Sequence, residues 1–249
     1  QIVYSYSSAF PHWLLNAFFL VFSALAVTAL VMGVRRYWDA LKTEANRNGF
    51  KPSGQGLYPC FLSALKEIIT HEKFSTCTSS KTRYASHLCV FFGFGALCLV
   101  TFWVITARIN PFAGGDFIYP FGFWSPWKML ANAGGLAVLA GCLLMAFDRF
   151  FRSEKAGAGS YFDWLLIATL FIVVITGFVT EVLHYVRLDP HRHLAYFIHL
   201  VFVFALLIYL PYSKLAHVVY RTTALVFAEY IGRNKKARAL SRTEDSHGR

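Results

Sequence analysis

The chain has 249 residues, of which 56% are hydrophobic and only 15% are charged, whereas soluble domains carry roughly 25% charged residues. This balance excludes an ordinary soluble domain and indicates a polytopic membrane protein. A net charge of +11 would suit a nucleic-acid partner, but the basic residues cluster between and after the apolar runs, so we expect no nucleic acid to bind.

Five apolar runs are long enough to cross a bilayer as helices, which takes about 20 residues each. In chain order they are Trp13–Val34, Tyr84–Ala107, Met129–Phe147, Phe162–Leu183 and Leu194–Val219. The sequence therefore predicts an all-α integral membrane protein, a bundle of five transmembrane helices. Pro211 predicts a kink in the last of them, because proline lacks the N–H that would bond to the preceding turn.

The orientation of the spans follows from the Lys and Arg residues of the loops, which gather on the cytoplasmic side. Nine of them lie from Arg35 to Arg83, three from Arg149 to Ser160 and seven after Val219, whereas the other two loops hold few. We expect the N-terminus outside, the C-terminal tail in the cytoplasm, and the protein in the inner (cytoplasmic) membrane of the cell.

The segment between the first two spans combines two patterns. GFKPSGQGLYP at 49–59 is typical of a loop because of its Gly, Pro and Ser content. CFLSALKEIITHEKF at 60–74 has apolar residues at helical spacing and predicts an amphipathic helix on the membrane surface.

Histidines in the second and fifth spans indicate a haem site. His199 and His217 are eighteen residues apart, which on one continuous helix is about 27 Å and five turns, so both rings would share a face. His217 lies four residues before Arg221 and His87 four residues after Arg83, so these two rings lie at matching depths. Neutral imidazole is a common axial ligand of haem iron, and His87 with His217 predicts an inner haem site. The alternative is two interfacial histidines bonded to backbone or phosphate.

His199 lies near the predicted outer surface and needs a partner at that depth. His12 on the first span and His184 at the end of the fourth both lie at about this depth, and the sequence leaves the choice between them open. The short connection between the fourth and fifth spans favours His184, and His12 would then be a boundary residue beside Trp13. The remaining four histidines are expected to be solvated loop or surface side chains: His71, His191, His193 and His247.

Further polar residues of the spans are candidates for quinone or haem contacts. Glu181 either carries protons for quinone chemistry or caps a helix end beside water, and Tyr185 is a second quinone candidate. Lys214 either snorkels to the cytoplasmic surface or holds a haem propionate or a quinone carbonyl. Arg83 and Arg221 flank the inner haem level, either as propionate partners or as positive-inside anchors.

Five spans with an outer N-terminus and histidines eighteen apart on the last resemble the gamma subunit of respiratory nitrate reductase, a dihaem b cytochrome. That pattern has two histidines on the second span, where this chain has only His87. A closer similarity is to the membrane subunit of the quinone-interacting membrane-bound oxidoreductase of sulfate reducers, which combines a cytochrome b domain with a portion like a heterodisulfide reductase subunit. It is carried by HEKFSTC at 71–77, RYASHLCVFFGF at 83–94, YFDWLLIATLFIVVITGFVTEVL at 161–183 and YFIHLVFVFALLIYLPYSKLAHVVYRTTALVFAEYIGR at 196–233.

This resemblance implies a haem b protein, with two haems favoured over one, that has menaquinone as its substrate. Its partners would be soluble flavin/iron–sulfur subunits on the cytoplasmic side, connected to adenylylsulfate reductase. The family's membrane subunit also carries a domain with two iron–sulfur clusters, to which no segment here corresponds; the five cysteines show no CxxC spacing.

The expected organisation has four parts. They are the outer N-terminus and first span at 1–36, a cytoplasmic segment with the amphipathic helix at 37–83, a four-helix haem-binding bundle at 84–219, and a basic cytoplasmic tail at 220–249. Two other functions compete with electron transfer. One is a proton or solute transporter, which would use the histidines and Glu181 along its path. The other is a membrane anchor without a cofactor.

Overall fold

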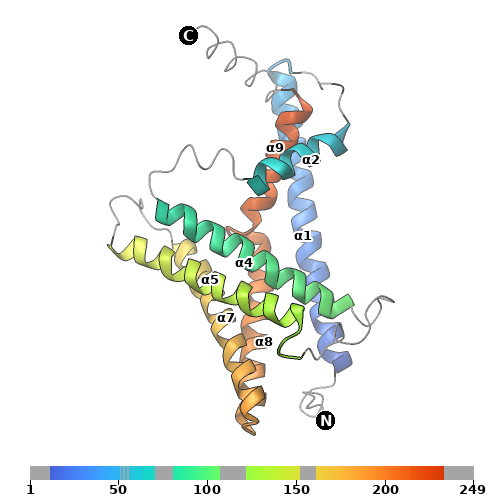
Figure 1. Ribbon diagram of the computed structural model, residues 1–249. Helices are drawn as coiled ribbons and strands as arrows, with labels where there is room; N and C mark the ends of the chain where they lie inside the picture. The colour runs from blue at the N-terminus through green and yellow to red at the C-terminus, as the bar shows by residue number, and fades with distance from the viewer. Residues whose placement is uncertain are drawn as a thin grey trace. The chain divides into compact units, whose positions relative to one another are not determined.

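The computed structural model describes residues 12–50, 52, 54, 56–70, 81–106, 122–151 and 161–232, and every regular element among them is helical. The α-helices are α1 (His12–Arg47), α2 (Leu57–Thr70), α4 (Lys81–Thr106), α5 (Pro126–Phe151), α7 (Tyr161–Val186), α8 (His191–Tyr209) and α9 (Ala216–Tyr230), with a 3₁₀ turn η3 (Leu210–Tyr212) (Figure 1). The predicted histidines His71 and His247 lie outside the described residues.

The prediction of five transmembrane helices is confirmed. Five helical stretches are long and apolar enough to cross a membrane: Trp13–Arg47, Thr82–Thr106, Pro126–Phe151, Tyr161–Val186 and His191–Tyr230. The chain is a multi-pass membrane protein of all-α class.

The last span is not one continuous helix, and this corrects the expectation of a simple kink at Pro211. Helix α8 ends at Tyr209, Pro211 lies inside η3, and α9 begins only at Ala216. Ser213 Oγ accepts the N–H of Leu215 at 3.1 Å across the break. The argument that His199 and His217 share a helix face requires an unbroken helix, so it does not hold.

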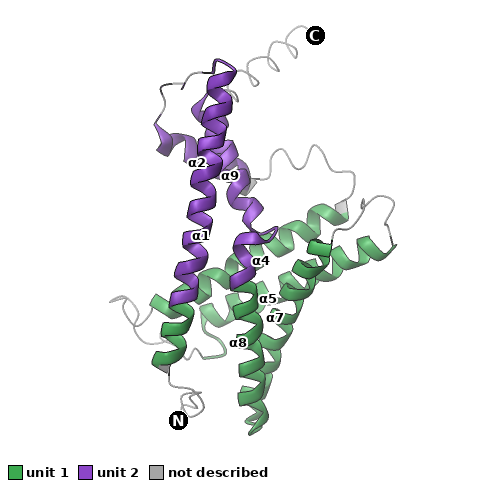
Figure 2. Ribbon diagram, turned by 180° about the vertical axis from the view of Figure 1, so that it is seen from behind, with its two compact units in different colours: residues 1–20, 78–207 green, residues 21–77, 208–249 purple. Residues whose placement is uncertain are grey.

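The described residues fall into two compact units (Figure 2). The first unit comprises Gln1–Leu20 and Thr78–Leu207, and the second comprises Val21–Cys77 and Ile208–Arg249.

In the first unit α4 and α5 pack closely through small residues. A Cβ atom on Gly93 would lie 2.6 Å from the carbonyl oxygen of Gly134, and one on Gly141 would lie 2.9 Å from the carbonyl oxygen of Ser86. Small residues allow such close approach in membranes, where van der Waals packing replaces the hydrophobic effect between helices. Trp103 and Trp127 stack at 4.6 Å near one end of this pair.

Helix α5 uses the next glycine for its other neighbour, α7. A Cβ on Gly135 would lie 2.9 Å from the ring of Phe178. One ion pair joins α5 and α7 at each end of their contact. Lys128 lies 2.9 Å from Glu181 at one end, and Arg149 lies 3.1 Å from Asp163 at the other. The adjacent glycines Gly134 and Gly135 of α5 thus contact two different helices, α4 and α7.

In the second unit α2 packs on α9 and on the later part of α1. Cys60 and Ala64 of α2 are almost fully buried and form a core with Val226, against which Trp38 packs. Helix α2 begins at Leu57, three residues before the predicted start, and Pro59 in its first turn costs no helical hydrogen bond. A helix is therefore present over Leu57–Thr70, and its place at a membrane surface stays a prediction.

Helix α1 ends in a defined cap. Gly49 has φ 69°, the Phe50 N–H donates to the Ala45 carbonyl at 3.0 Å, and the Gly49 N–H donates to Asn46 at 3.2 Å. This is the Schellman arrangement that a left-handed glycine permits.

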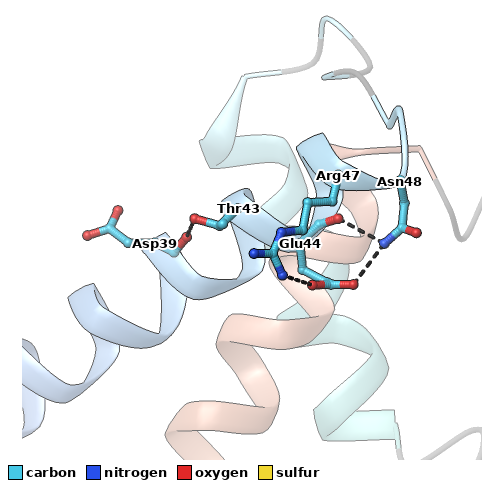
Figure 3. Close-up of polar contacts among 5 residues, drawn as sticks. All are labelled: Asp39, Thr43, Glu44, Arg47 and Asn48. Atoms are coloured by element: carbon cyan, nitrogen blue, oxygen red, sulfur yellow. Dashed lines mark hydrogen bonds and ion pairs between the residues drawn. The ribbon is translucent and has the colours of Figure 1, made fainter.

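Side chains add to this cap. Asn48 Nδ2 donates to both the carbonyl and the carboxylate of Glu44, and Arg47 lies 3.9 Å from that carboxylate (Figure 3). These local contacts thus stabilise the last two turns of α1.

Candidate functional site

The ring of His199 is held by helix α7. Its Nδ1 lies 3.1 Å from the carbonyl oxygen of Val173 and 3.1 Å from Oγ1 of Thr176. The Thr176 hydroxyl donates to the carbonyl of Ile172 at 2.8 Å, so its oxygen accepts from the ring. Two acceptors at Nδ1 place the proton there, because a neutral imidazole carries one N–H and one lone pair. The lone pair is then on Nε2, which is the nitrogen that binds a metal when Nδ1 is bonded to a backbone carbonyl.

A glycine makes room for this ring. A Cβ atom on Gly177 would lie 3.2 Å from Cε1 of His199, which is tighter than ordinary van der Waals contact. Gly177 lies one residue after Thr176, so one turn of α7 supplies both the polar contact and the space. Position and tautomer of the His199 ring are therefore both set by α7.

These contacts place His199 well away from His184. His199 is level with Val173–Gly177, and His184 lies seven or more residues farther along α7, which is roughly 10 Å or more. The expectation that His184 and His199 lie at equal depth is thus corrected. Residues Val173, Thr176 and Gly177 of α7 also occupy the space on the side of the His199 ring that faces α7.

Helix α1 offers the other candidate. The rings of Phe18 on α1 and Phe204 on α8 are in contact, with centroids 5.1 Å apart. The first turns of α1, residues 12–20, belong to the same compact unit as α8, and Figure 1 shows these turns and α8 rising in the same direction. His12 lies six residues before Phe18 and His199 five before Phe204, so the helical register brings positions 12 and 199 to the same level within about 1.5 Å.

The two inner histidines belong to different units. His87 on α4 is half-buried, and its ring stacks on that of Phe91 with centroids 6.3 Å apart. His217 on α9 is exposed, and its Nδ1 lies 2.6 Å from the carbonyl oxygen of Lys214. As for His199, a carbonyl at Nδ1 leaves the lone pair on Nε2. Their pairing stays a prediction.

Glu181 is held by two residues of α5 that the sequence analysis did not single out. Lys128 Nζ lies 2.9 Å from Oε2, and Asn132 Nδ2 donates to Oε1 at 3.1 Å. The side chain of Glu181 is 15% exposed and that of Lys128 is 24% exposed. Both carboxylate oxygens thus have partners on a neighbouring helix, which argues against a helix cap. The available signal was the spacing of Lys128 and Asn132, which places both on one helix face.

Tyr185 lies one turn after Glu181 and takes part in an aromatic cluster. Its ring meets the edge of Phe123 with centroids 5.8 Å apart, and the ring of His184 at the same centroid distance. Tyr185 itself is exposed. The predicted quinone candidates Glu181 and Tyr185 therefore lie at the same end of α7 as His184.

The first turn of α8 contains a buried cation, Arg192. Arg192 Nε lies 2.6 Å from Asp189 Oδ1, and the Arg192 side chain is only 8% exposed. His193 lies 3.4 Å from the same carboxylate and is mostly buried, which corrects its expected place as a solvated loop residue. Arg192 is seven residues before His199, close to two helical turns, so both leave one face of α8.

The remaining predicted residues are more open to their surroundings. Arg83 is half-buried, whereas Lys214 and Arg221 are exposed. A buried ion pair that the sequence analysis did not single out, Arg149 with Asp163, lies at the other end of α7 from Glu181. Arg149 also lies over the Trp164 ring, 6.0 Å from its centroid.

The curated proteins that match the chain include two kinds of relative. It is 26% identical over 155 residues to the E-type subunit of the dihydromethanophenazine:CoB–CoM heterodisulfide reductase of Methanosarcina thermophila, covering 59% of each chain. It is 29% identical over 226 residues to citrate utilization protein B of Escherichia coli, covering 87% of this chain and 56% of that protein. The matches thus span little more than half the length of these relatives. No solved structure matches the chain.

The resemblance to heterodisulfide reductase membrane subunits holds at this coarser level, because the archaeal relatives are subunits of such a reductase. The more specific link to adenylylsulfate reduction has no support among these matches. The model of the citrate utilization protein B family matches residues 6–239, and the chain therefore belongs to that family.

Proposed function

We propose that this chain is a b-type cytochrome subunit that passes electrons between the quinone pool and soluble flavin/iron–sulfur subunits. The observation that carries the proposal is the state of His199, an imidazole inside an apolar span whose Nδ1 is bonded to α7 and whose Nε2 keeps its lone pair. This donor chemistry fits an axial ligand of haem b. A haem bound through such nitrogens would supply one-electron redox chemistry.

The outer pair of ligands in this proposal is His199 and His12. Since α7 fills one side of the His199 ring, the second ligand has to come from another helix. Position 12 of α1 is level with position 199 of α8 by the Phe18–Phe204 contact, whereas His184 is not. Rings at the same depth on neighbouring helices are what bis-histidine ligation requires.

The inner pair is His87 and His217, as the depth count from Arg83 and Arg221 predicts. The Lys214 carbonyl at Nδ1 of His217 supports this role, because it leaves Nε2 as the metal-binding nitrogen. Arg83, Arg221 and Lys214 remain the candidates for the propionates of the inner haem.

For the outer haem, Arg192 is a better propionate candidate than any residue named from the sequence. It is buried, it lies on the His199 face of α8, and it is two turns nearer the end of that helix. Its Nε lies 2.6 Å from Asp189 Oδ1 and donates to His193 Nε2 at 3.4 Å, which fixes the position of the guanidinium. Charge-assisted bonds from arginine to a carboxylate are strong and orient both groups.

Glu181 is the proposed proton-exchanging group for the quinone, with Tyr185 beside it. A carboxylate held by Lys128 and Asn132 within a membrane span has a fixed position. The archaeal relatives are named for a reductase that uses dihydromethanophenazine, a redox-active small molecule. Menaquinone is the expected substrate here.

The competing functions make different predictions. The break at Pro211 is a feature that transporters also show, where interrupted helices line a substrate site. A cofactor-free anchor needs none of the contacts of His199. A proton path would also use the lone-pair nitrogen of His199, so the presence of haem decides between that function and electron transfer.

The test is a visible reduced-minus-oxidised spectrum of the purified full chain in detergent, taken with a size-exclusion profile that shows folded protein. We expect an α-band of the b type. A folded protein without any such band would overturn the proposal and favour the transporter or the anchor.

A further inference from the structure

Helix α2 has two apolar sides, and only one is used inside the protein. Cys60 and Ala64 face Val226 and are each 1% exposed. At about 100° per residue, a second apolar stripe adjoins this one on the helix surface. Its members are large and exposed: Leu57, Tyr58, Phe61 and Leu62, with exposed fractions from 44 to 73%.

The remaining arc of the α2 surface carries the polar residues Ser63, Lys66 and Glu67. Ser63 Oγ donates to Glu229 Oε1 at 3.4 Å, and Lys66 is exposed. The helix therefore presents one apolar side to α9, a second apolar side outward, and a polar side away from that second one. With 14 residues it is about 21 Å long, too short to cross a membrane.

The level of α2 along α1 is set by its contact with Trp38. This residue lies four positions after Val34, the last apolar residue of the first span, or about 6 Å beyond it. The headgroup layer on each side of a bilayer is roughly 5 to 7 Å thick. Tyr37 and Tyr220, in edge contact at 5.6 Å, lie at the same level, as expected of an aromatic belt.

Charge favours the same environment. The exposed cations of this unit are Arg35, Arg36, Lys42, Arg47, Lys66, Lys214 and Arg221, whereas its exposed acids among the described residues are Asp39 and Glu44. Basic residues beside a membrane are attracted to anionic lipids. The apolar side chains of α1 in this unit, among them Leu25 and Val31, are exposed and precede Trp38, the residue of α1 against which α2 packs.

We propose that α2 lies in the surface of the lipid leaflet where the first span ends, with Leu57, Tyr58, Phe61 and Leu62 sunk among the acyl chains of anionic phospholipid. The helix is then an interfacial helix that lies parallel to the membrane plane and packs against the extramembrane ends of α1 and α9. Its apolar stripe is continuous with the lipid-facing surface of α1, and its basic residues meet the headgroups. This inference does not depend on haem or quinone binding.

The test places a nitroxide on the full chain in nanodiscs of phosphatidylcholine and phosphatidylglycerol. An azide-bearing residue introduced at Phe61 carries the label, so the native cysteines stay unmodified; Lys66, on the polar side of the same helix, is the matched control. We expect the label at 61 to be relaxed strongly by oxygen and weakly by a water-soluble nickel chelate, and the label at 66 to show the reverse.

Two results would overturn the proposal. Strong relaxation by the nickel chelate at 61 would place this side of α2 in water. Protection of 61 from both oxygen and nickel would show that protein covers it, either a second copy of the chain or another part of this one. Both positions are exposed, so labelling them leaves the core around Cys60 untouched.

Discussion

His199 Nδ1 lies 3.1 Å from the carbonyl oxygen of Val173, on a helix that precedes its own in the chain. The backbone of α7 thereby decides which nitrogen of His199 keeps a lone pair. A side-chain substitution cannot remove a backbone carbonyl. Most substitutions near Val173 should therefore leave the proton of His199 on Nδ1. What can be changed is the hydroxyl that shares the same proton, and the glycine that makes room for the ring.

Thr176→Val should alter the His199 site without removing it. The substitution deletes one of two acceptors at Nδ1 and keeps the Val173 carbonyl. We expect haem to be retained and the midpoint potential of one haem to shift, because hydrogen bonding at the far nitrogen tunes the basicity of the ligand. Spectroelectrochemical titration measures it.

Thr169→Val is the matched control for this experiment. Thr169 is also on α7 and bonds to its own helix at Leu165, 2.7 Å away, but no contact joins it to His199 in the described structure. It should leave both potentials unchanged. Equal shifts in the two variants would show that the Thr176 contact has no special role.

His12→Ala and His184→Ala should differ in haem content. The register of α1 on α8 predicts that the His12 variant loses one haem and that the His184 variant keeps both. The measurement is haem per protein after identical purification. Loss of a haem in the His184 variant alone would refute the assignment of the outer ligand.

Gly93→Ala and Gly95→Ala, two residues apart on α4, should differ in their effects on stability. A Cβ on Gly93 would meet the Gly134 carbonyl at 2.6 Å, whereas a Cβ on Gly95 meets nothing within 4 Å. Overpacking at Gly93 should destabilise the protein by about 1–3 kcal/mol. Gly95→Ala should be neutral or slightly stabilising, because alanine is the better helix former.

Thermal unfolding in one detergent measures both glycine variants. Equal melting temperatures would contradict the close contact of α4 with α5.

Glu181→Gln should slow electron transfer from a quinol while leaving the haem spectrum unchanged. The substitution removes the charge that Lys128 faces but keeps an oxygen for Asn132. Leaving Lys128 mostly buried without its counter-charge should also destabilise the protein by up to about 3 kcal/mol. Lys128→Met in the same background should recover part of this stability and none of the quinol activity.

Quinol-driven haem reduction by stopped flow separates these effects. If the Glu181→Gln variant reduces at the normal rate, Glu181 is a structural ion-pair residue only.

The sequence predicts most of the architecture because bilayer spans are specified locally. Twenty apolar residues in a row exclude most alternatives, and the five spans match the five long apolar helices. The amphipathic pattern at 60–74 likewise appears as α2 with its buried side at Cys60 and Ala64.

The sequence-based prediction of a shared face for His199 and His217 is wrong because it depends on one continuous helix. Pro211 suggests a kink, but the chain also leaves the α conformation for several residues around Ser213, which removes the shared face of His199 and His217. The depth predicted for His184 by counting residues is also wrong. The turn at Arg187 and the contact of the His199 ring with Val173 set the register between α7 and α8, and a residue count along the chain cannot give that register.

The hydropathy and charge pattern of the sequence does not predict which residues of different helices are in contact. Glu181 stood out as a charge in a span, but its partners Lys128 and Asn132 are about fifty residues away on a different helix. Arg192 has the sequence context of an ordinary loop cation, and only the fold buries it beside Asp189.

The most direct test of the central claim is haem b quantified by pyridine haemochrome in the purified wild-type chain and in His199→Ala. The account predicts haem b in the wild type and a loss of one haem per chain in the variant, with the protein still folded. Identical haem content in the two proteins, or no haem b in a folded wild type, would contradict it.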